Sequence, residues 1–389
     1  MITKTYAEIN EKIKSGKAVV VTAEEIIKIV EEKGIEAATK EVDVVTTATF
    51  GPMCSSGAFL NFGHANPAIR MEKILLNDVE AYGGLAAVDT YIGATAESLT
   101  QGYQYGGAHV ICDLIDGKDI HLKATAKGTD CYPRKEIDTY VSLSEMNEAY
   151  LYNPRNCYQN YAAAINTSNK RLFTYMGILA PNSKVVNYST SGQLSPLLND
   201  PLYKTIGMGT RIFIGGTQGY VSWRGTQFKS GVKRDENDLP HGAAGTLALI
   251  GDMKKMSTKY IQPAIFEKYG TSMFVGVGIP IPLLNEEITK HVSIKDEDIY
   301  TSVIDYSVSD GPKPILKEVS YKELRSGKID INGQEVKTAP LSSLKKAREI
   351  ADELKSWIQK GEFTLQEPIE TFPVDNTLNG LKIRQKRSK

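Results

Sequence analysis

Residues 44–57 read Val44-Val45-Thr46-Thr47-Ala48-Thr49-Phe50-Gly51-Pro52-Met53-Cys54-Ser55-Ser56-Gly57, an apolar β-branched run that leads into a loop of small residues around a cysteine. The run predicts a buried strand over 42–49. A strand holds the thiol that follows it in place, and the flanking glycines let a ligand approach the backbone closely. Cys54 is therefore a candidate catalytic cysteine. The alternative is a buried structural thiol, which is the usual state of a free cysteine.

A second cysteine has similar surroundings, in Lys127-Gly128-Thr129-Asp130-Cys131-Tyr132-Pro133-Arg134. Lys127 and Arg134 favour its thiolate form, whereas Asp130 opposes it. Because the thiolate is the reactive form of cysteine, Cys131 is the second candidate catalytic thiol.

The remaining cysteines, Cys112 and Cys157, are expected to be structural. Cys112 lies in Val110-Ile111-Cys112-Asp113-Leu114, an alternating run in which a small apolar thiol packs well. The four cysteines are widely spaced and form no C-x-x-C motif, so the sequence predicts reduced thiols, no disulfide framework and no metal site.

Length and composition predict a folded globular protein. The 389 residues contain 46 basic and 46 acidic side chains, and 41% are hydrophobic. This balance argues against disorder and against a nucleic-acid or anionic-membrane partner, and the basic run 382–389 is expected to be a solvated tail. No run approaches the roughly 20 apolar residues of a membrane span, and no apolar signal core is present, so a cytoplasmic protein is expected.

The pattern of elements predicts a mixed α/β (α+β) fold in a single large catalytic domain, 1–389. Its sub-regions are an α/β segment (1–50), a β-rich and loop-rich core (51–245) and a second α/β segment (246–389). Expected helices span 6–14, 22–34 (with a Thr22–Glu25 capping box), a stretch from about 253, and 343–360. Expected strands span 18–21, 108–114, 120–126, 185–188, 211–214, 247–250 and 273–277, with a hairpin at 329–336 and loops at 103–107 and 215–219.

Three histidines in loops are candidate acids or bases for thiol chemistry: His64, His109 and His241. Each also fits a hydrogen-bonded loop residue. His64, in a glycine-containing loop, is additionally assigned to substrate binding. No H-E-x-x-H motif is present, which argues against a zinc hydrolase.

The densest loop signal is Gly215-Gly216-Thr217-Gln218-Gly219, which follows a predicted strand and offers backbone N–H groups to an anion. Gly215, Gly216 and Gly219 are therefore assigned to substrate binding. Arg224 is assigned as a bidentate partner for a carboxylate, with a surface ion pair as the alternative. Arg70 and Arg155 are weaker candidates for the same task. The loop matches neither G-x-G-x-x-G nor the P-loop, so no nucleotide is inferred.

On the motifs Gly51–Gly57, Gly128–Pro133 and Ile214–Tyr220, the chain resembles the homocysteine-biosynthesis family of anaerobic archaea and some anaerobic bacteria, the L-aspartate semialdehyde sulfurtransferases. The resemblance covers nearly the whole chain. It implies that the family's two functional cysteines correspond to Cys54 and Cys131. It also implies the reductive conversion of L-aspartate 4-semialdehyde to L-homocysteine.

The same resemblance carries expectations about cofactors and partners. No tightly bound cofactor is expected. Sulfide or a persulfide would supply sulfur, a small ferredoxin-like iron–sulfur protein would supply electrons, and a homo-oligomer is possible. Many members carry a C-terminal pair of CBS modules, whereas this chain ends at Lys389, so no CBS modules are expected.

The chemistry suits two thiols in one pocket. A persulfide on one cysteine can deliver sulfur to the carbonyl carbon, and the second thiol can resolve it. Direct attack needs near-bonding distance, so Cys54 and Cys131 are expected to lie together, with Gly215–Gly219 and Arg224 lining the same pocket.

Two other functions stay open at the level of the residues. The first is an acyltransferase or aldehyde-converting enzyme with a cysteine nucleophile, which would need a nucleotide or coenzyme A. The second is an iron–sulfur or metal-binding scaffold held by Cys54, Cys131 and a third ligand.

Overall fold

The computed structural model describes residues 2–383, which form a mixed α+β fold, as the sequence predicts. Residues 384–389 of the basic tail lie outside the described residues. The main sheet contains β1 (Val20–Thr22), β2 (Val44–Pro52), β3 (Gly57–Asn61), β4 (Lys73–Leu76), β5 (Val79–Tyr82), β6 (Asp89–Gly93), β7 (Glu97–Ser98), β8 (Gly102–Gly106), β9 (Ile120–Thr125), β10 (Glu136–Val141), β11 (Glu148–Asn156), β16 (Arg211–Ile214), β17 (Thr217–Arg224), β18 (Leu247–Asp252), β19 (Ile261–Phe266) and β20 (Gly270–Pro282).

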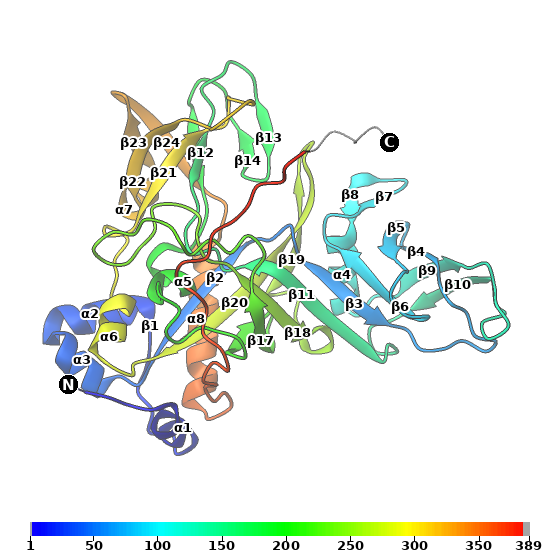
Figure 1. Cartoon of the computed structure of the whole chain (residues 1–389), viewed down its shortest axis with the longest axis horizontal. Coiled ribbons are helices and arrows are strands. Elements are labelled where there is room, and N and C mark those ends of the chain that lie inside the picture. The colour runs from blue at the N-terminus through cyan, green and yellow to red at the C-terminus, as the bar shows by residue number, and fades with distance from the viewer. Residues whose placement is uncertain (1, 384–389) are drawn as a thin grey trace.

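Two smaller sheets accompany the main sheet (Figure 1). One contains, in spatial order, β22 (Ile315–Ser320), β21 (Tyr300–Asp305), β12 (Ala163–Ile165), β15 (Val185–Tyr188), β24 (Gln334–Pro340) and β23 (Lys328–Ile331). The other is the hairpin of β13 (Leu172–Thr174) and β14 (Gly177–Leu179). The helices are α1 (Tyr6–Lys14), α2 (Ala23–Lys33), α3 (Ile35–Glu41), α4 (Gly107–Ile115), α5 (Pro196–Asn199), α6 (Glu286–Val292), α7 (Tyr321–Arg325) and α8 (Leu344–Gln359), with 3-10 turns η1 (Gly192–Leu194) and η2 (Met253–Lys255).

The main sheet follows the strand order β1-β2-β20-β16-β17-β18-β11-β3-β6-β5-β4-β9-β10. Near the β1 end of this order, β2 and β20 form a long antiparallel pair, in register from Val44 opposite Pro282 to Pro52 opposite Phe274. Helix α8 lies against this pair with Ile350 and Leu354 fully buried. The long pair therefore gives β2 a rigid position, and the chain leaves it just before Cys54.

Local signals account for the N-terminal elements. Thr22 accepts a hydrogen bond from the backbone N–H of Glu25, whose side chain accepts one from the Thr22 backbone, so the expected capping box begins α2. Gly34 ends α2 at φ +82°, but a further helix, α3, follows it directly. The Asn332-Gly333 turn of the β23–β24 hairpin has positive φ at both residues, as expected for its type.

Four predictions of secondary structure are wrong in whole or in part. Residues 217–219 of the expected loop 215–219 belong to strand β17. Residues 108–114 form helix α4 and not a strand, because the segment is apolar on nearly all sides and its spacing fits either period. Residues 102–106 form strand β8 and not a loop. The helix expected from about Met253 is only the short turn η2.

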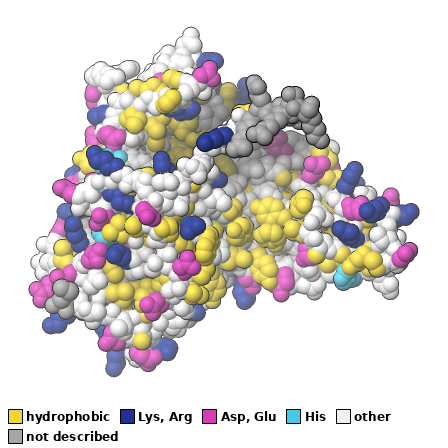
Figure 2. Space-filling model, viewed as in Figure 1, with side chains coloured by type: hydrophobic (Ala, Val, Ile, Leu, Met, Phe, Trp, Pro, Cys, Tyr) yellow, Lys and Arg dark blue, Asp and Glu magenta, His cyan; other side chains and the backbone are white. Residues whose placement is uncertain are grey.

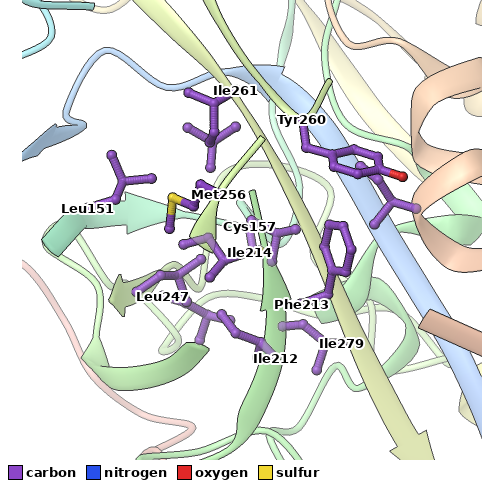
Figure 3. Close-up of a cluster of buried hydrophobic side chains, with 14 of the residues drawn as sticks. Leu151, Cys157, Ile212, Phe213, Ile214, Leu247, Met256, Tyr260, Ile261 and Ile279 are labelled. Atoms are coloured by element: carbon purple, nitrogen blue, oxygen red, sulfur yellow. The ribbon is translucent and has the colours of Figure 1, made fainter. Parts of the chain in front are cut away.

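The buried core extends over the main sheet, and Cys157 belongs to it. Figure 3 shows Cys157 among Leu151, Ile214, Leu247 and Met256. On the outer face, cross-strand register aligns Tyr82, Tyr91, Phe59 and Tyr150 in one row. Figure 2 shows hydrophobic side chains gathered where β3 and β11 lie. Over residues 2–383, no helix is both long and apolar enough to cross a membrane.

Candidate active site

Cys54 lies in a tight turn that leads from β2 to β3. The backbone N–H of Met53 donates to the Met273 carbonyl on β20 at 2.8 Å, and the backbone N–H and hydroxyl of Ser56 donate to the Met53 carbonyl at 3.1 and 2.8 Å. Both residues that flank the turn are therefore held by hydrogen bonds. The thiol itself is half-buried, so it is both positioned and accessible.

The serines that flank Cys54 tie its turn to β11. Ser55 Oγ donates to the carbonyl of Arg155 at 3.1 Å, and Asn153 Nδ2 donates to Ser56 Oγ at 2.6 Å. Asn153 is fully buried. The position of Cys54 is thus coupled to the residues that end β11.

Cys54 opens into a cavity of about 510 Å³, within the range of small-molecule sites. Seven segments that are distant in the sequence contribute to it. Its lining consists of Pro52, Met53, Cys54, Ser55, Thr95, Arg155, Tyr158, Tyr161, Tyr175, Met176, Ser189, Tyr269 and Leu341. A larger hollow of about 740 Å³ runs along α1, but its lining contains no cysteine or histidine, so the Cys54 cavity is the better candidate site.

Four tyrosines surround the thiol, and they come from different parts of the fold. Tyr269 occupies the turn between β19 and β20, and Tyr175 occupies the turn between β13 and β14. Their ring centroids are 6.2 Å apart. Tyr161 lies 6.3 Å from Tyr175 and 5.0 Å from Tyr158, measured between ring centroids. The cavity is therefore enclosed by the main sheet and the small hairpin together.

Tyr269 lines the same cavity as Cys54, and the two side chains are close enough to influence each other electrostatically. Burial, and then the negative charge of an ionised Cys54, raise the pKa of Tyr269 to about 12. Burial also raises the pKa of Tyr161, with a contribution from its neighbour Tyr175. These phenols stay protonated near neutral pH, so they can donate hydrogen bonds to a substrate oxygen or to sulfur.

Arg155 is the charged side chain of the cavity. Its Nε donates to Thr226 Oγ1 at 3.1 Å, and its guanidinium interacts with the hydroxyl of Tyr158. Burial raises the pKa of Tyr158, whereas the charge of Arg155 opposes this rise. Of the three arginines that the sequence singles out, the structure brings only Arg155 to Cys54.

Cys131 does not line this cavity. It is exposed in the loop between β9 and β10, with its Sγ 3.5 Å from Thr129 Oγ1. The neighbouring Tyr132 ring stacks on His64 with centroids 6.1 Å apart, so Cys131 and His64 lie in one region, away from Cys54. In Figure 1, β9 and β10 lie at the right-hand end of the main sheet, whereas β2 lies beside β1, towards the other end of the strand order.

The expectation that both thiols share one pocket is therefore not met within a single chain. Strand β3 separates Cys54 from His64, which lies in the region of Cys131. The strand begins three residues after Cys54 and ends three residues before His64. A five-residue strand carries the chain over roughly 13 Å, at about 3.3 Å per residue. A cluster held jointly by Cys54 and Cys131 in one chain has no support from this arrangement.

The glycine-rich loop also lies elsewhere. Gly215 and Gly216, at φ +61° and +97°, form the tight turn between β16 and β17, and an added methyl group on either would lie 3.0 Å from a neighbouring side chain. An added methyl group at Gly219 would collide with the Ile250 carbonyl. Arg224 lies at the end of β17 beside Trp223. The expectation that these four residues line the Cys54 cavity needs correction, because Gly215 and Gly216 serve a hairpin turn, and Gly219 and Arg224 lie on the strand that follows it.

The other candidate residues have structural surroundings. Cys112 is buried on α4, and burial raises its pKa to about 12. Burial likewise raises the pKa of Cys157. His109 Nδ1 accepts the backbone N–H of Gly106 at the start of α4, and His241 lies near Glu318 and Asp235 at the surface. None of these residues lines the cavity of Cys54.

The tyrosines are the part of the site that sequence reasoning missed. The chain contains 20 tyrosines, but their sequence neighbours do not distinguish the four that surround Cys54. Among residues 2–383, no group of three or more His, Cys, Asp or Glu side chains is arranged to hold a metal ion.

Comparison with known proteins identifies the family. Residues 18–365 match the family described as "Homocysteine biosynthesis enzyme, sulfur-incorporation". The L-aspartate semialdehyde sulfurtransferase of Methanosarcina acetivorans is 52% identical over 385 residues, which cover 99% of this chain and 75% of that protein. The enzyme of the same name from Methanocaldococcus jannaschii is 51% identical over 387 residues, covering 96% and 74%.

A more distant relative, an uncharacterized protein of Methanothermobacter thermautotrophicus, is 28% identical over 339 residues, covering 84% of this chain and 73% of that protein. No solved structure matches the chain significantly. The chain belongs to the family of homocysteine biosynthesis enzymes that incorporate sulfur.

Proposed function

We propose that this protein is a sulfurtransferase that converts L-aspartate 4-semialdehyde to L-homocysteine, with Cys54 as its catalytic thiol. The observation that carries the proposal is the half-buried Cys54 at the wall of a small-molecule cavity. Similarity to two relatives that bear this name supports it.

The overall reaction exchanges the aldehyde oxygen for sulfur. One aldehyde, one hydrogen sulfide, two electrons and two protons give one thiol and one water. If sulfur arrives as a Cys54 persulfide, cleavage of its S–S bond takes two further electrons and returns Cys54 as a thiol. In this proposal Tyr269, which lines the cavity and stays protonated near neutral pH, donates a proton to the carbonyl oxygen that departs as water.

Cys131 enters the proposal as a second redox-active thiol. Its exposed position suits exchange with an external sulfur donor or with a ferredoxin-like iron–sulfur protein that supplies electrons. We expect the enzyme to work in the cytoplasm, where thiols stay reduced. A homo-oligomer stays a prediction that sedimentation analysis tests, and the outer aromatic row of the main sheet is a surface that it would cover.

The test is an anaerobic assay with sulfide, titanium(III) citrate and L-aspartate 4-semialdehyde, with homocysteine measured by mass spectrometry. We expect homocysteine with the purified protein and only background product without it. Cys54→Ala should fall to that background. Full activity in Cys54→Ala would contradict the assignment of the thiol, and no product with the wild type under these conditions would contradict the proposed activity.

A further inference from the structure

The charge pattern of the Cys54 cavity matches only part of the proposed substrate. Aspartate semialdehyde carries an aldehyde, a carboxylate and an ammonium group. Among the described residues that line the cavity, Arg155 alone carries a permanently charged side chain, and no Asp or Glu is present. The cavity thus contains a partner for the carboxylate but no carboxylate for the ammonium.

Arg155 is well prepared to bind an anion. Its backbone N–H donates to Asn153 Oδ1 at 3.0 Å, and its carbonyl accepts from Ser55 Oγ at 3.1 Å, so its backbone is fixed relative to the turn of Cys54. Among residues 2–383, no Asp or Glu oxygen lies within 4.0 Å of a guanidinium nitrogen of Arg155. Its charge is therefore available to a ligand, in a position coupled to the thiol.

The tyrosines of the cavity can bind the ammonium group only weakly, compared with the binding of the carboxylate by Arg155. Burial keeps Tyr269 and Tyr161 in their neutral form, so they contribute no negative charge near neutral pH. Their ring faces can attract a cation, but such contacts are individually weak compared with a bidentate ion pair.

We propose that the cavity recognises short aldehydes through their carboxylate, and that it therefore accepts 4-oxobutanoate, which lacks the ammonium group. This inference rests on the proposed function. The balanced reaction is 4-oxobutanoate plus hydrogen sulfide, two electrons and two protons, giving 4-sulfanylbutanoate and water. The aldehyde carbon is reduced, the oxygen leaves as water, and the low-potential donor of the parent reaction supplies the electrons.

The experiment compares three aldehydes under identical anaerobic conditions with sulfide and titanium(III) citrate. These are aspartate semialdehyde, 4-oxobutanoate without the ammonium, and 3-aminopropanal without the carboxylate. Loss of a cation–π contact should lower kcat/KM by about 30-fold or less. Loss of the carboxylate that pairs with the partly buried guanidinium of Arg155 should lower kcat/KM by about 100-fold or more. We expect 4-oxobutanoate to be the better of the two analogues.

A matched pair of variants tests the residue. Arg155→Met should abolish the preference for 4-oxobutanoate over 3-aminopropanal, because it removes the cation, and Arg155→Lys should keep part of it. Arg224→Met, the same change outside the cavity, should keep the wild-type preference. A wild type that turns over aspartate semialdehyde but prefers 3-aminopropanal would overturn this inference and leave the proposed function standing. Absence of turnover with aspartate semialdehyde would instead contradict the proposed function.

Discussion

The ring centroids of Tyr269 and Tyr175 lie 6.2 Å apart, although Tyr269 belongs to a hairpin of the main sheet and Tyr175 to the separate β13–β14 hairpin. The Tyr175 hydroxyl also lies 2.8 Å from that of Tyr306, which follows β21 of the six-stranded sheet. Tyrosines thus connect all three sheets around the Cys54 cavity. The site exists only where these sheets meet.

Replacement of Tyr269 by Phe removes a hydroxyl from the Cys54 cavity and keeps the ring. If this phenol donates the proton that leaves with the carbonyl oxygen, kcat should fall by about 100-fold or more. The protonated form of Tyr269 is lost only as pH rises towards its pKa of about 12. Deprotonation of Tyr269 should therefore not lower wild-type activity between neutral and moderately alkaline pH. Steady-state rates across this range check both statements. Tyr220→Phe, on the exposed face of β17, is the control and should match the wild type.

Cys54 and Cys112 should respond in opposite ways to replacement by Ala. Cys54→Ala should lose turnover with little change in melting temperature, because its side chain is only half-buried. Cys112→Ala should keep turnover and lose about 1 kcal/mol of unfolding free energy, since its thiol is packed on α4. Urea denaturation and the homocysteine assay measure the two effects. Loss of activity in Cys112→Ala at unchanged stability would reverse the assignment of the two thiols.

Cys131→Ser tests whether the exposed thiol acts after Cys54. The variant should fold normally, because Cys131 is exposed, and should still form a persulfide on Cys54 when given a sulfane-sulfur donor. Repeated turnover should be lost. Intact-protein mass spectrometry detects the persulfide, and the homocysteine assay detects turnover. Unchanged turnover in Cys131→Ser would exclude a required role for this thiol.

Gly276 should not tolerate a side chain, because β20 approaches α8 closely there. An added methyl group would lie 2.8 Å from Ile350 Cδ1 and 3.2 Å from the Tyr260 carbonyl oxygen. Gly276→Ala should cost about 1–3 kcal/mol of unfolding free energy, as overpacked cores do. Gly242→Ala is the control, since its methyl group would meet no atom within 4 Å. Equal stability of the two variants would show that α8 adjusts freely.

We expect the ionised Asp43 side chain to make the free energy of unfolding depend on pH in the acid range. Burial raises its pKa, but hydrogen bonds from Lys12 Nζ at 2.6 Å and the Val19 backbone N–H at 3.0 Å, together with the charge of Lys4, outweigh burial and lower it. A lowered pKa contributes stability above the ordinary value of 3.8, and this contribution is lost as pH falls through the folded pKa.

Replacement of Asp43 tests this contribution. Asp43→Asn should lower the unfolding free energy by about 1–3 kcal/mol near neutral pH and flatten its acid dependence. The control is Glu11→Gln, which removes the exposed ion-pair partner of Lys14 on α1 and should change the free energy of unfolding little. Parallel acid dependences of Asp43→Asn and the wild type would contradict the assignment.

Local signals determined much of the fold from the sequence alone. The capping boxes of α1 and α2, the Asn332-Gly333 turn and the start of α8 at Ser343 depend on residues a few positions apart. The same locality places Cys54 just after β2. Helix α4 was missed, because a segment buried on nearly all sides shows neither period clearly.

The composition of the site was decided only by the tertiary structure. The order of strands in a sheet depends on pairings between distant segments. These pairings bring Arg155 and Tyr269 to Cys54 and put β9 and β10, whose loop contains Cys131, at the far end of the main sheet from β2. The two glycines at 215–216 illustrate the same limit, because positive φ serves a hairpin turn and an anion-binding loop equally well. The sequence alone determined the thiol and the strand that holds it, since both depend on adjacent residues. What surrounds that thiol was decided by the packing of three sheets, which no neighbouring residue encodes.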